Sequence, residues 1–143
     1  MPTTDDPHDL QRFVDAQDAV IDDVKRELRS GRKRSHWMWF VFPQVEGLGS
    51  SEMARRYAIS SRAEAEAYLA HPILGARLRE CTALVNAVDG RSATEVFGSP
   101  DDLKFRSSMT LFEAVADDPA PFATALERYY DGDRDEKTLD LLD

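Results

Sequence analysis

The chain has 143 residues, a length that favours one domain, and its 42% hydrophobic and 31% charged residues are typical of a globular protein. A single cysteine excludes an internal disulfide framework and a cysteine-rich zinc site. The net charge of −9 disfavours a nucleic-acid-binding or membrane-surface role. The longest apolar stretch, residues 37–43, is far shorter than the roughly 20 residues of a bilayer span. Residues 1–9 also lack the pattern of a signal peptide, so we expect a cytoplasmic protein.

Helical periodicity dominates the first 90 residues. Apolar side chains recur every three, four and seven positions between residues 9 and 29, which predicts one amphipathic helix. A short helix is predicted to begin near Ser50 or Ser51, and another at the capping-box pattern of Ser61 and Glu64. Residues 72–88 carry the next helical repeat, which begins at a proline.

The remaining residues also favour helices. A second capping-box pattern begins at Ser92, and the run Ser99–Asp102, with a cap, a proline and two acids, predicts a helix that extends to about residue 116. Residues 122–130 predict one more helix, and residues 133–143 a weak terminal helix. Residues 1–8 are expected to be disordered. The sequence therefore predicts an all-α fold, a compact single domain over residues 1–143 with about six to eight helices and short loops.

The segment from residue 32 to residue 44 is the most unusual one. It contains both tryptophans, Trp37 and Trp39, within an apolar run for which no partner strand is evident, so we expect a short buried helix or an extended central plug. In one interpretation these aromatic side chains form the core. In the other, an indole stacks on a flat ligand near Gln44 and the glycine-containing loop that follows, with His36 beside them.

Polar side chains interrupt the helix predicted to start at residue 101. Lys104, Ser107 and Ser108 share one face at spacings of three and four, and Thr110 lies on a neighbouring face. These hydroxyls either bond back to carbonyls one turn earlier or form one polar wall of a pocket, with Lys104 as its cation.

A third candidate group precedes and opens the helix over residues 72–88. His71 either caps that helix or acts as a general acid or base, Gly75 permits close helix packing, and Arg77 reaches an anion or a neighbouring acid. The six basic residues between Lys25 and Arg34 are expected to pair with the acidic ends of the chain. We find no metal-binding or nucleophile motif, and the sequence implies no cofactor.

Several strings carry a family resemblance. Residues 35–44 (SHWMWFVFPQ) and the stretch Lys104–Phe112 (KFRSSMTLF) are the most specific, and further matching segments extend the resemblance over about residues 9–142. The chain resembles the bacterial domain-of-unknown-function family numbered 1810. The resemblance implies a small all-helical domain and supplies no established reaction. A fainter similarity, at Lys104-Phe105, is to the helical NADAR group, which is linked to NAD and ADP-ribose chemistry.

We therefore expect a pocket for a flat, anionic small molecule such as a nucleotide or an ADP-ribose derivative. If a reaction occurs, hydrolysis or group transfer is favoured over redox chemistry, with His36, His71 or Lys104 as the catalytic candidates. The alternative is a non-catalytic domain that binds a protein partner and uses the aromatic segment as its core. Membrane and nucleic-acid partners are disfavoured. The expected ligand-binding residues are Trp37, Trp39, Gln44, Arg77, Lys104, Ser107, Ser108 and Thr110.

Overall fold

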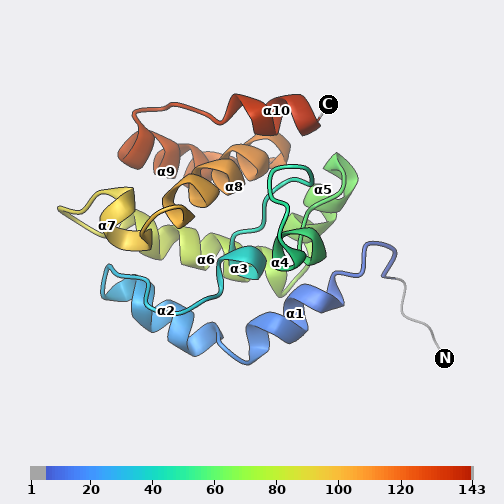
Figure 1. Ribbon diagram of the computed structural model, residues 1–143, viewed down its shortest axis with the longest axis horizontal. Coiled ribbons are helices and arrows are strands. Elements are labelled where there is room, and N and C mark those ends of the chain that lie inside the picture. The colour runs from blue at the N-terminus through green and yellow to red at the C-terminus, as the bar shows by residue number, and fades with distance from the viewer. Residues whose placement is uncertain (1–5, 143) are drawn as a thin grey trace.

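A computed structural model describes residues 6–142, and these residues form ten helices and no strand (Figure 1). The predicted all-α class is confirmed, whereas the predicted number of six to eight helices is too low. In chain order, the helices are α1 (Gln11–Asp18), α2 (Ile21–Arg29), α3 (Met38–Val41), α4 (Glu52–Arg56), α5 (Arg62–Ala70), α6 (Leu74–Asn86), α7 (Ala93–Phe97), α8 (Asp101–Val115), α9 (Ala120–Tyr130) and α10 (Glu136–Leu142).

Two departures from the expected pattern explain the higher number. The helix predicted over residues 9–29 is divided at Ala19 and Val20, where Val20 leaves the helical conformation with φ −130° and ψ −4°. The resulting bend lets α1 and α2 follow the rounded surface of the other helices (Figure 1), so that Phe13 and Leu28 are both fully buried. The apolar segment after Trp37 folds as the short helix α3, one of its two predicted forms.

Local capping signals identified several helix starts correctly. Ser51, Ser61 and Ser92 each accept a hydrogen bond from the backbone N–H three residues later, at 3.1 Å. At Ser92 the Glu95 carboxylate also accepts from the Ser92 N–H at 2.8 Å, which completes a capping box. These bonds lie within one turn, so the sequence alone is sufficient to predict them.

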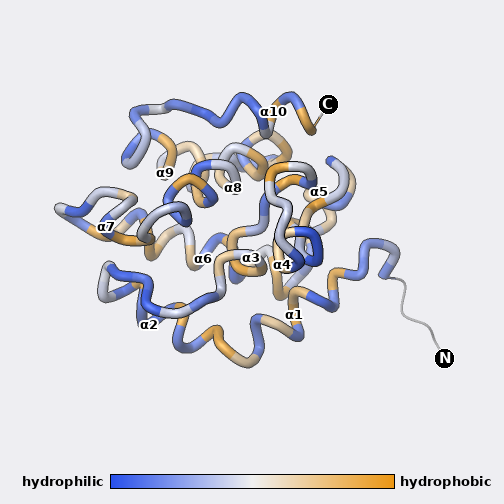
Figure 2. The backbone as a smooth tube through the Cα atoms, in the orientation of Figure 1, coloured by the Kyte–Doolittle hydropathy of each residue, from blue (hydrophilic) through white to orange (hydrophobic). Residues whose placement is uncertain are grey.

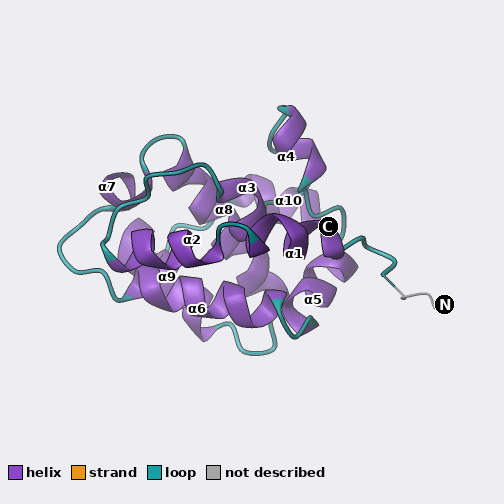
Figure 3. Ribbon diagram, turned by 90° about the horizontal axis from the view of Figure 1, so that it is seen from below, coloured by secondary structure: helices purple, strands orange, loops and turns teal. Residues whose placement is uncertain are grey.

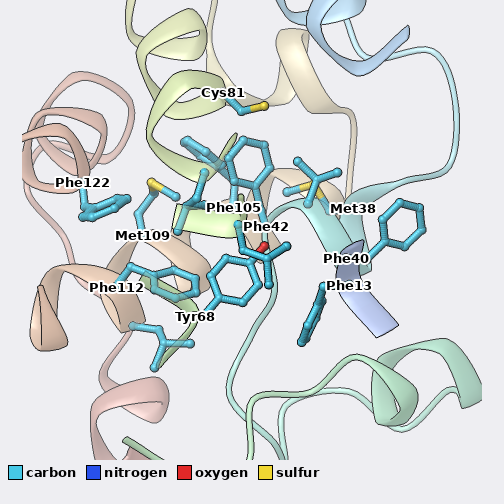
Figure 4. Close-up of a cluster of buried hydrophobic side chains, with 14 of the residues drawn as sticks. Phe13, Met38, Phe40, Phe42, Tyr68, Cys81, Phe105, Met109, Phe112 and Phe122 are labelled. Atoms are coloured by element: carbon cyan, nitrogen blue, oxygen red, sulfur yellow. The ribbon is translucent and has the colours of Figure 1, made fainter. Parts of the chain in front are cut away.

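Helix α8 lies at the centre of the fold and packs against α5, α7, α9 and α10. Phe42, which follows α3, meets Phe105 of α8 edge to face with 4.9 Å between ring centroids, and Phe112 continues the cluster toward Tyr68. Figure 4 shows these aromatic side chains gathered around one centre. The aromatic segment therefore supplies core, as one of the two interpretations expected.

The connection between α3 and α4 is held by a short piece of backbone pairing. The Ile59 N–H donates to the Gln44 carbonyl at 2.9 Å, and the Glu46 N–H donates to the Ile59 carbonyl at 2.8 Å. Figure 3 shows α4 projecting from the other helices beyond this pairing. The pairing keeps the base of the loop in place while α4 borders open space.

The two ends of the chain contribute polar surface. Of residues 1–8, which were predicted to be disordered, residues 1–5 lie outside the described residues. Asp6 accepts hydrogen bonds from the backbone N–H groups of Leu10 and Gln11. The segment leading into α10 is strongly hydrophilic (Figure 2). Over residues 6–142, no helix combines the length and the hydrophobicity that crossing a bilayer requires.

Candidate functional site

An open groove of about 490 Å³ lies between three segments that are distant in the sequence. One wall is the loop from Gln44 to Ser51, the second is the first two turns of α8, and the third is the chain at Asp135 and Lys137. The side chains of Gln44, Lys104 and Ser107, all expected from the sequence to bind ligand, line this groove. The tertiary fold thus brings two of the predicted polar regions together.

Three basic side chains among residues 6–142 line the groove of this acidic protein, and two of them form ion pairs of 3.2–3.5 Å with carboxylates. Lys104 Nζ lies 3.4 Å from Asp101, and Arg106 lies 3.2 Å from Asp133 and 3.5 Å from Asp135. Lys137 forms no ion pair with a carboxylate among residues 6–142. Most ion pairs elsewhere are closer, with Arg12–Glu64, Lys33–Asp101 and Arg77–Asp18 each at 2.8 Å. The groove therefore contains loosely paired positive charge that an external anion could neutralise.

Trp39 lies beside this positive charge. Lys104 Nζ is 5.3 Å from the centre of the Trp39 ring, close enough for a cation–π contact. Trp39 also lines a small adjoining pocket that shares Gln44, Gly49 and Ala54 with the groove. That pocket, of about 20 Å³, has room for about one water molecule. This pocket is too small for a ring, and Trp39 does not itself line the groove, so Trp39 borders the groove through its contact with Lys104.

Among residues 6–142, Asp135 is the one carboxylate that lines the groove. Its Oδ2 accepts a hydrogen bond from Ser107 Oγ at 2.8 Å and another from Thr138 Oγ1. Its backbone N–H donates to Thr110 Oγ1 at 3.0 Å. Burial acts to raise the pKa of Asp135, but these two hydroxyl bonds and Arg106 outweigh it and lower the pKa below its usual value. Asp135 is therefore ionised at neutral pH.

Of the hydroxyl residues of α8, Ser107 lines the groove, whereas Ser108 and Thr110 do not. The single hydroxyl hydrogen of Ser107 is donated mainly to Asp135 Oδ2 at 2.8 Å and is shared with Leu103 O at 3.2 Å, and Thr110 donates to Arg106 O at 2.8 Å. Both therefore bond back by one turn and also bind the segment before α10. Ser108 is fully buried and its Oγ has no hydrogen-bond partner among the described residues.

Trp37 lies apart from the groove. Its side chain is 1% exposed, and its Nε1 donates to Glu27 Oε1 at 2.9 Å. The same carboxylate accepts from the N–H groups of Arg34 and Ser35 and from Ser35 Oγ. Although burial acts to raise the pKa of Glu27, these bonds lower it to about 2. Trp37 and Glu27 thus anchor the start of the aromatic segment.

The other expected site residues also do not line the groove. His71 Nδ1 accepts from the N–H groups of Ile73 and Leu74 at 3.1 and 3.2 Å, so it caps the start of α6. Arg77 donates to Asp18 and to Gln17, both on α1. His36 is exposed before α3. Of the three catalytic candidates, Lys104 therefore lines the groove, and His36 and His71 do not.

Three charged groove residues were absent from the expected set, namely Arg106, Asp135 and Lys137. Arg106 is adjacent to the polar stripe of α8, and its basic charge was a usable signal. Asp135 is followed three residues later by Thr138, a spacing typical of a helix start. That signal predicts a helix start at Asp135. It does not predict that Asp135 contacts Ser107 of α8, because the two residues are 28 positions apart.

No group of three His, Cys, Asp or Glu side chains over residues 6–142 is arranged to hold a metal ion. Cys81 is fully buried, and burial raises the pKa of its thiol to about 12. The chemistry that the groove offers is therefore anion binding by cations and hydrogen bonding by hydroxyl, amide and carboxylate groups.

The chain is similar to known proteins over nearly its whole length. A family model described as "Protein of unknown function (DUF1810)" matches residues 7–142. The crystal structure of the conserved hypothetical protein Rv1873 from Mycobacterium tuberculosis is similar, with a TM-score of 0.95 and 60% sequence identity over 96% of this chain and 98% of that chain. None of the curated proteins matches the sequence.

Proposed function

The chain belongs to the DUF1810 family, and from the groove we propose that it binds an anionic small molecule with a flat ring, such as a nucleotide or an ADP-ribose derivative. The observation that carries this proposal is the convergence of Lys104, Arg106 and Lys137 on one groove of a protein with a net charge of −9. Lys137 has no carboxylate partner among residues 6–142, and the ion pairs of Lys104 and Arg106, at 3.2–3.5 Å, are longer than most others, which supports binding of phosphate oxygens by all three.

The arrangement assigns parts of the ligand to parts of the groove. The phosphate lies among the basic side chains, because a charge-assisted hydrogen bond is about twice as strong as a neutral one. The flat ring lies toward Trp39, whose ring already attracts Lys104. Gln44 lines the groove between these regions and offers both donors and an acceptor.

The proposal is limited to binding. Neither His36 nor His71 lines the groove, and Asp135, which does, is ionised at neutral pH. Among the residues expected from the sequence, we therefore propose Gln44, Lys104 and Ser107 as the groove-lining ligand contacts, and Trp39, which contacts Lys104, as a residue at the edge of the site. Arg106 and Lys137 join them as cations.

A thermal-shift and calorimetry experiment with ADP, ADP-ribose and ribose 5-phosphate tests this proposal. A ligand at about 100 times its Kd stabilises the protein by about 2.7 kcal/mol, which corresponds to a rise in Tm of about 5 °C or more. The Lys104→Ala variant is expected to bind about tenfold more weakly, because one charged hydrogen bond is lost.

The matched control is Lys25→Ala. Lys25 lies on α2, 3.0 Å from Glu80, and does not line the groove. If Lys104→Ala reduces the affinity for the ligand and Lys25→Ala leaves it unchanged, the result supports binding in the groove. No shift with any of the three compounds, or equal effects of the two variants, contradicts the proposal.

The alternative function, a non-catalytic domain that binds a protein, has one observation in its favour. Leu103 lines the groove and is 55% exposed, an apolar contact that a nucleotide phosphate does not need. In this alternative, Leu103→Ser abolishes capture of a protein partner, while the nucleotides above produce no thermal shift.

A further inference from the structure

The carboxylate of Asp135 stands among the basic side chains of the groove. Arg106 and Lys137 line the groove with it, and Lys104 lies one helical turn from Ser107, which bonds to Asp135. Its two oxygens are unequally used. Oδ2 accepts from Ser107 and Thr138, whereas Oδ1 has one contact among the described residues, with Arg106 Nη2 at 3.5 Å.

Oδ1 therefore retains most of its capacity to accept hydrogen bonds. An N–H···O hydrogen bond is normally 2.7–3.2 Å long, so the contact with Arg106 is weak. The Asp135 side chain is 15% exposed and lines the groove, which leaves this capacity available to a bound molecule. A carboxylate accepts up to about four hydrogen bonds, and three groups contact this one.

The charge of Asp135 determines which ligand group can lie against it. An ionised carboxylate accepts hydrogen bonds and donates none, and it repels a second anion at close range. A phosphate therefore binds to the basic side chains at a distance from Asp135, and the group that faces Oδ1 must donate hydrogen. A ribose supplies two neighbouring hydroxyl groups, which match this requirement within one nucleotide.

Building on the proposed function, we propose that Asp135 binds the hydroxyl pair of a ribose and so makes the groove selective for ribonucleotides over 2′-deoxyribonucleotides. The inference depends on the bound anion being a nucleotide, and it adds the sugar as the recognised part. Asp135 is then a specificity-determining residue, held in position by Ser107 and Thr138.

The test compares ADP with 2′-deoxy-ADP by calorimetry on the wild-type protein, the Asp135→Asn variant and an Asp133→Asn control. In Asp135→Asn, the amide oxygen takes the place of Oδ2 and keeps the bonds from Ser107 and Thr138, while the amide nitrogen presents a donor where Oδ1 accepted. Asp133 undergoes the same change in charge and also contacts Arg106, but it does not line the groove.

We expect the wild type and Asp133→Asn to bind ADP about tenfold more tightly than 2′-deoxy-ADP, since one charged hydrogen bond differs. In Asp135→Asn the two compounds bind within about threefold of each other. Circular dichroism melts show whether each variant folds. The comparison of ADP with 2′-deoxy-ADP on the wild-type protein tests the selectivity even if a variant does not fold.

Each result has one consequence. Equal affinity of the wild type for the two compounds overturns the selectivity, and a preference that persists in folded Asp135→Asn overturns the assignment to Asp135. If the wild type binds neither compound, the selectivity is refuted, and the proposed function fails with it only if ADP-ribose and ribose 5-phosphate also produce no thermal shift. Binding of both without preference leaves the proposed function standing and refutes this inference alone.

Discussion

The Glu27 carboxylate links two segments of the chain that are otherwise joined by a loop. From its position on α2 it accepts hydrogen bonds from Arg34, Ser35 and Trp37, all on the approach to α3. Its residue is 8% exposed, so water replaces few of these bonds. An isolated buried carboxylate is costly, whereas one that receives four hydrogen bonds stabilises the fold in its charged form.

Glu27 is expected to make stability depend on acid pH. Its pKa is lowered from 4.5 to about 2 in the folded protein, so its contribution of about 3 kcal/mol is complete above about pH 4.5 and is lost as the pH falls toward 2. Glu27→Gln should lower the free energy of unfolding at pH 7 by about 2–3 kcal/mol. Chemical denaturation from pH 7 to pH 2.5 should show the difference from wild type shrinking below pH 4.5.

The charge-matched control for this prediction is Glu66→Gln. Glu66 is exposed on α5, and its substitution should change the free energy of unfolding by at most about 0.5 kcal/mol. A difference between Glu27→Gln and wild type that stays constant with pH would show that the loss is one of packing rather than of charge.

At the scale of elements, the close approach of α5 and α6 depends on a glycine. A Cβ placed on Gly75, in the first turn of α6, would lie 2.1 Å from the carbonyl oxygen of Leu69 on α5. That distance is far inside van der Waals contact, and the neighbouring atom is backbone. The sequence-based expectation that Gly75 permits close helix packing is consistent with this geometry.

Gly75→Ala should therefore destabilise the protein by about 1–3 kcal/mol, because α5 and α6 must separate. In an open helix the same substitution stabilises by about 1 kcal/mol, so the sign of the effect distinguishes the two cases. Thermal or chemical denaturation measures it. Ala76→Gly, at the exposed neighbouring position, is the control and should cost about 1 kcal/mol from helix propensity alone. A stabilised Gly75→Ala protein would show that the helices do not meet here.

At the scale of the whole molecule, the charge that lines the groove differs in sign from the net charge of the chain. The net charge is −9, yet the groove is lined by three basic side chains and one acidic side chain. A small anion in the groove contacts mainly these cations. A long polyanion must extend beyond the groove and is repelled by the net negative charge of the chain.

Binding should therefore discriminate by the size of the anion. At about 0.15 M salt, a fluorescent 20-nucleotide DNA or RNA should show no change in anisotropy at protein concentrations that bind ADP. The affinity for ADP should itself fall as salt rises from 0.05 to 0.5 M, because the contacts are ionic. An oligonucleotide that binds more tightly than ADP would point to a nucleic-acid surface instead.

About half of the candidate site could be anticipated from local spacing. Lys104 and Ser107 are three residues apart on one helix, so the sequence places them on one face. The different roles of Trp37 and Trp39 could not be derived in this way, since the apolar run around them has no periodicity and their burial depends on how α3 lies against α8. Asp135 was missed because its bond to Ser107 spans 28 residues.

The sequence by itself determined the helical class, most helix starts and the polar face of α8, because periodicity and capping involve residues within one or two turns of each other. The tertiary structure alone decided the bend between α1 and α2 and the assembly of a cationic groove from three distant segments. Those features depend on which faces meet when the apolar surfaces are buried, and this is a property of the whole chain rather than of any one stretch of it.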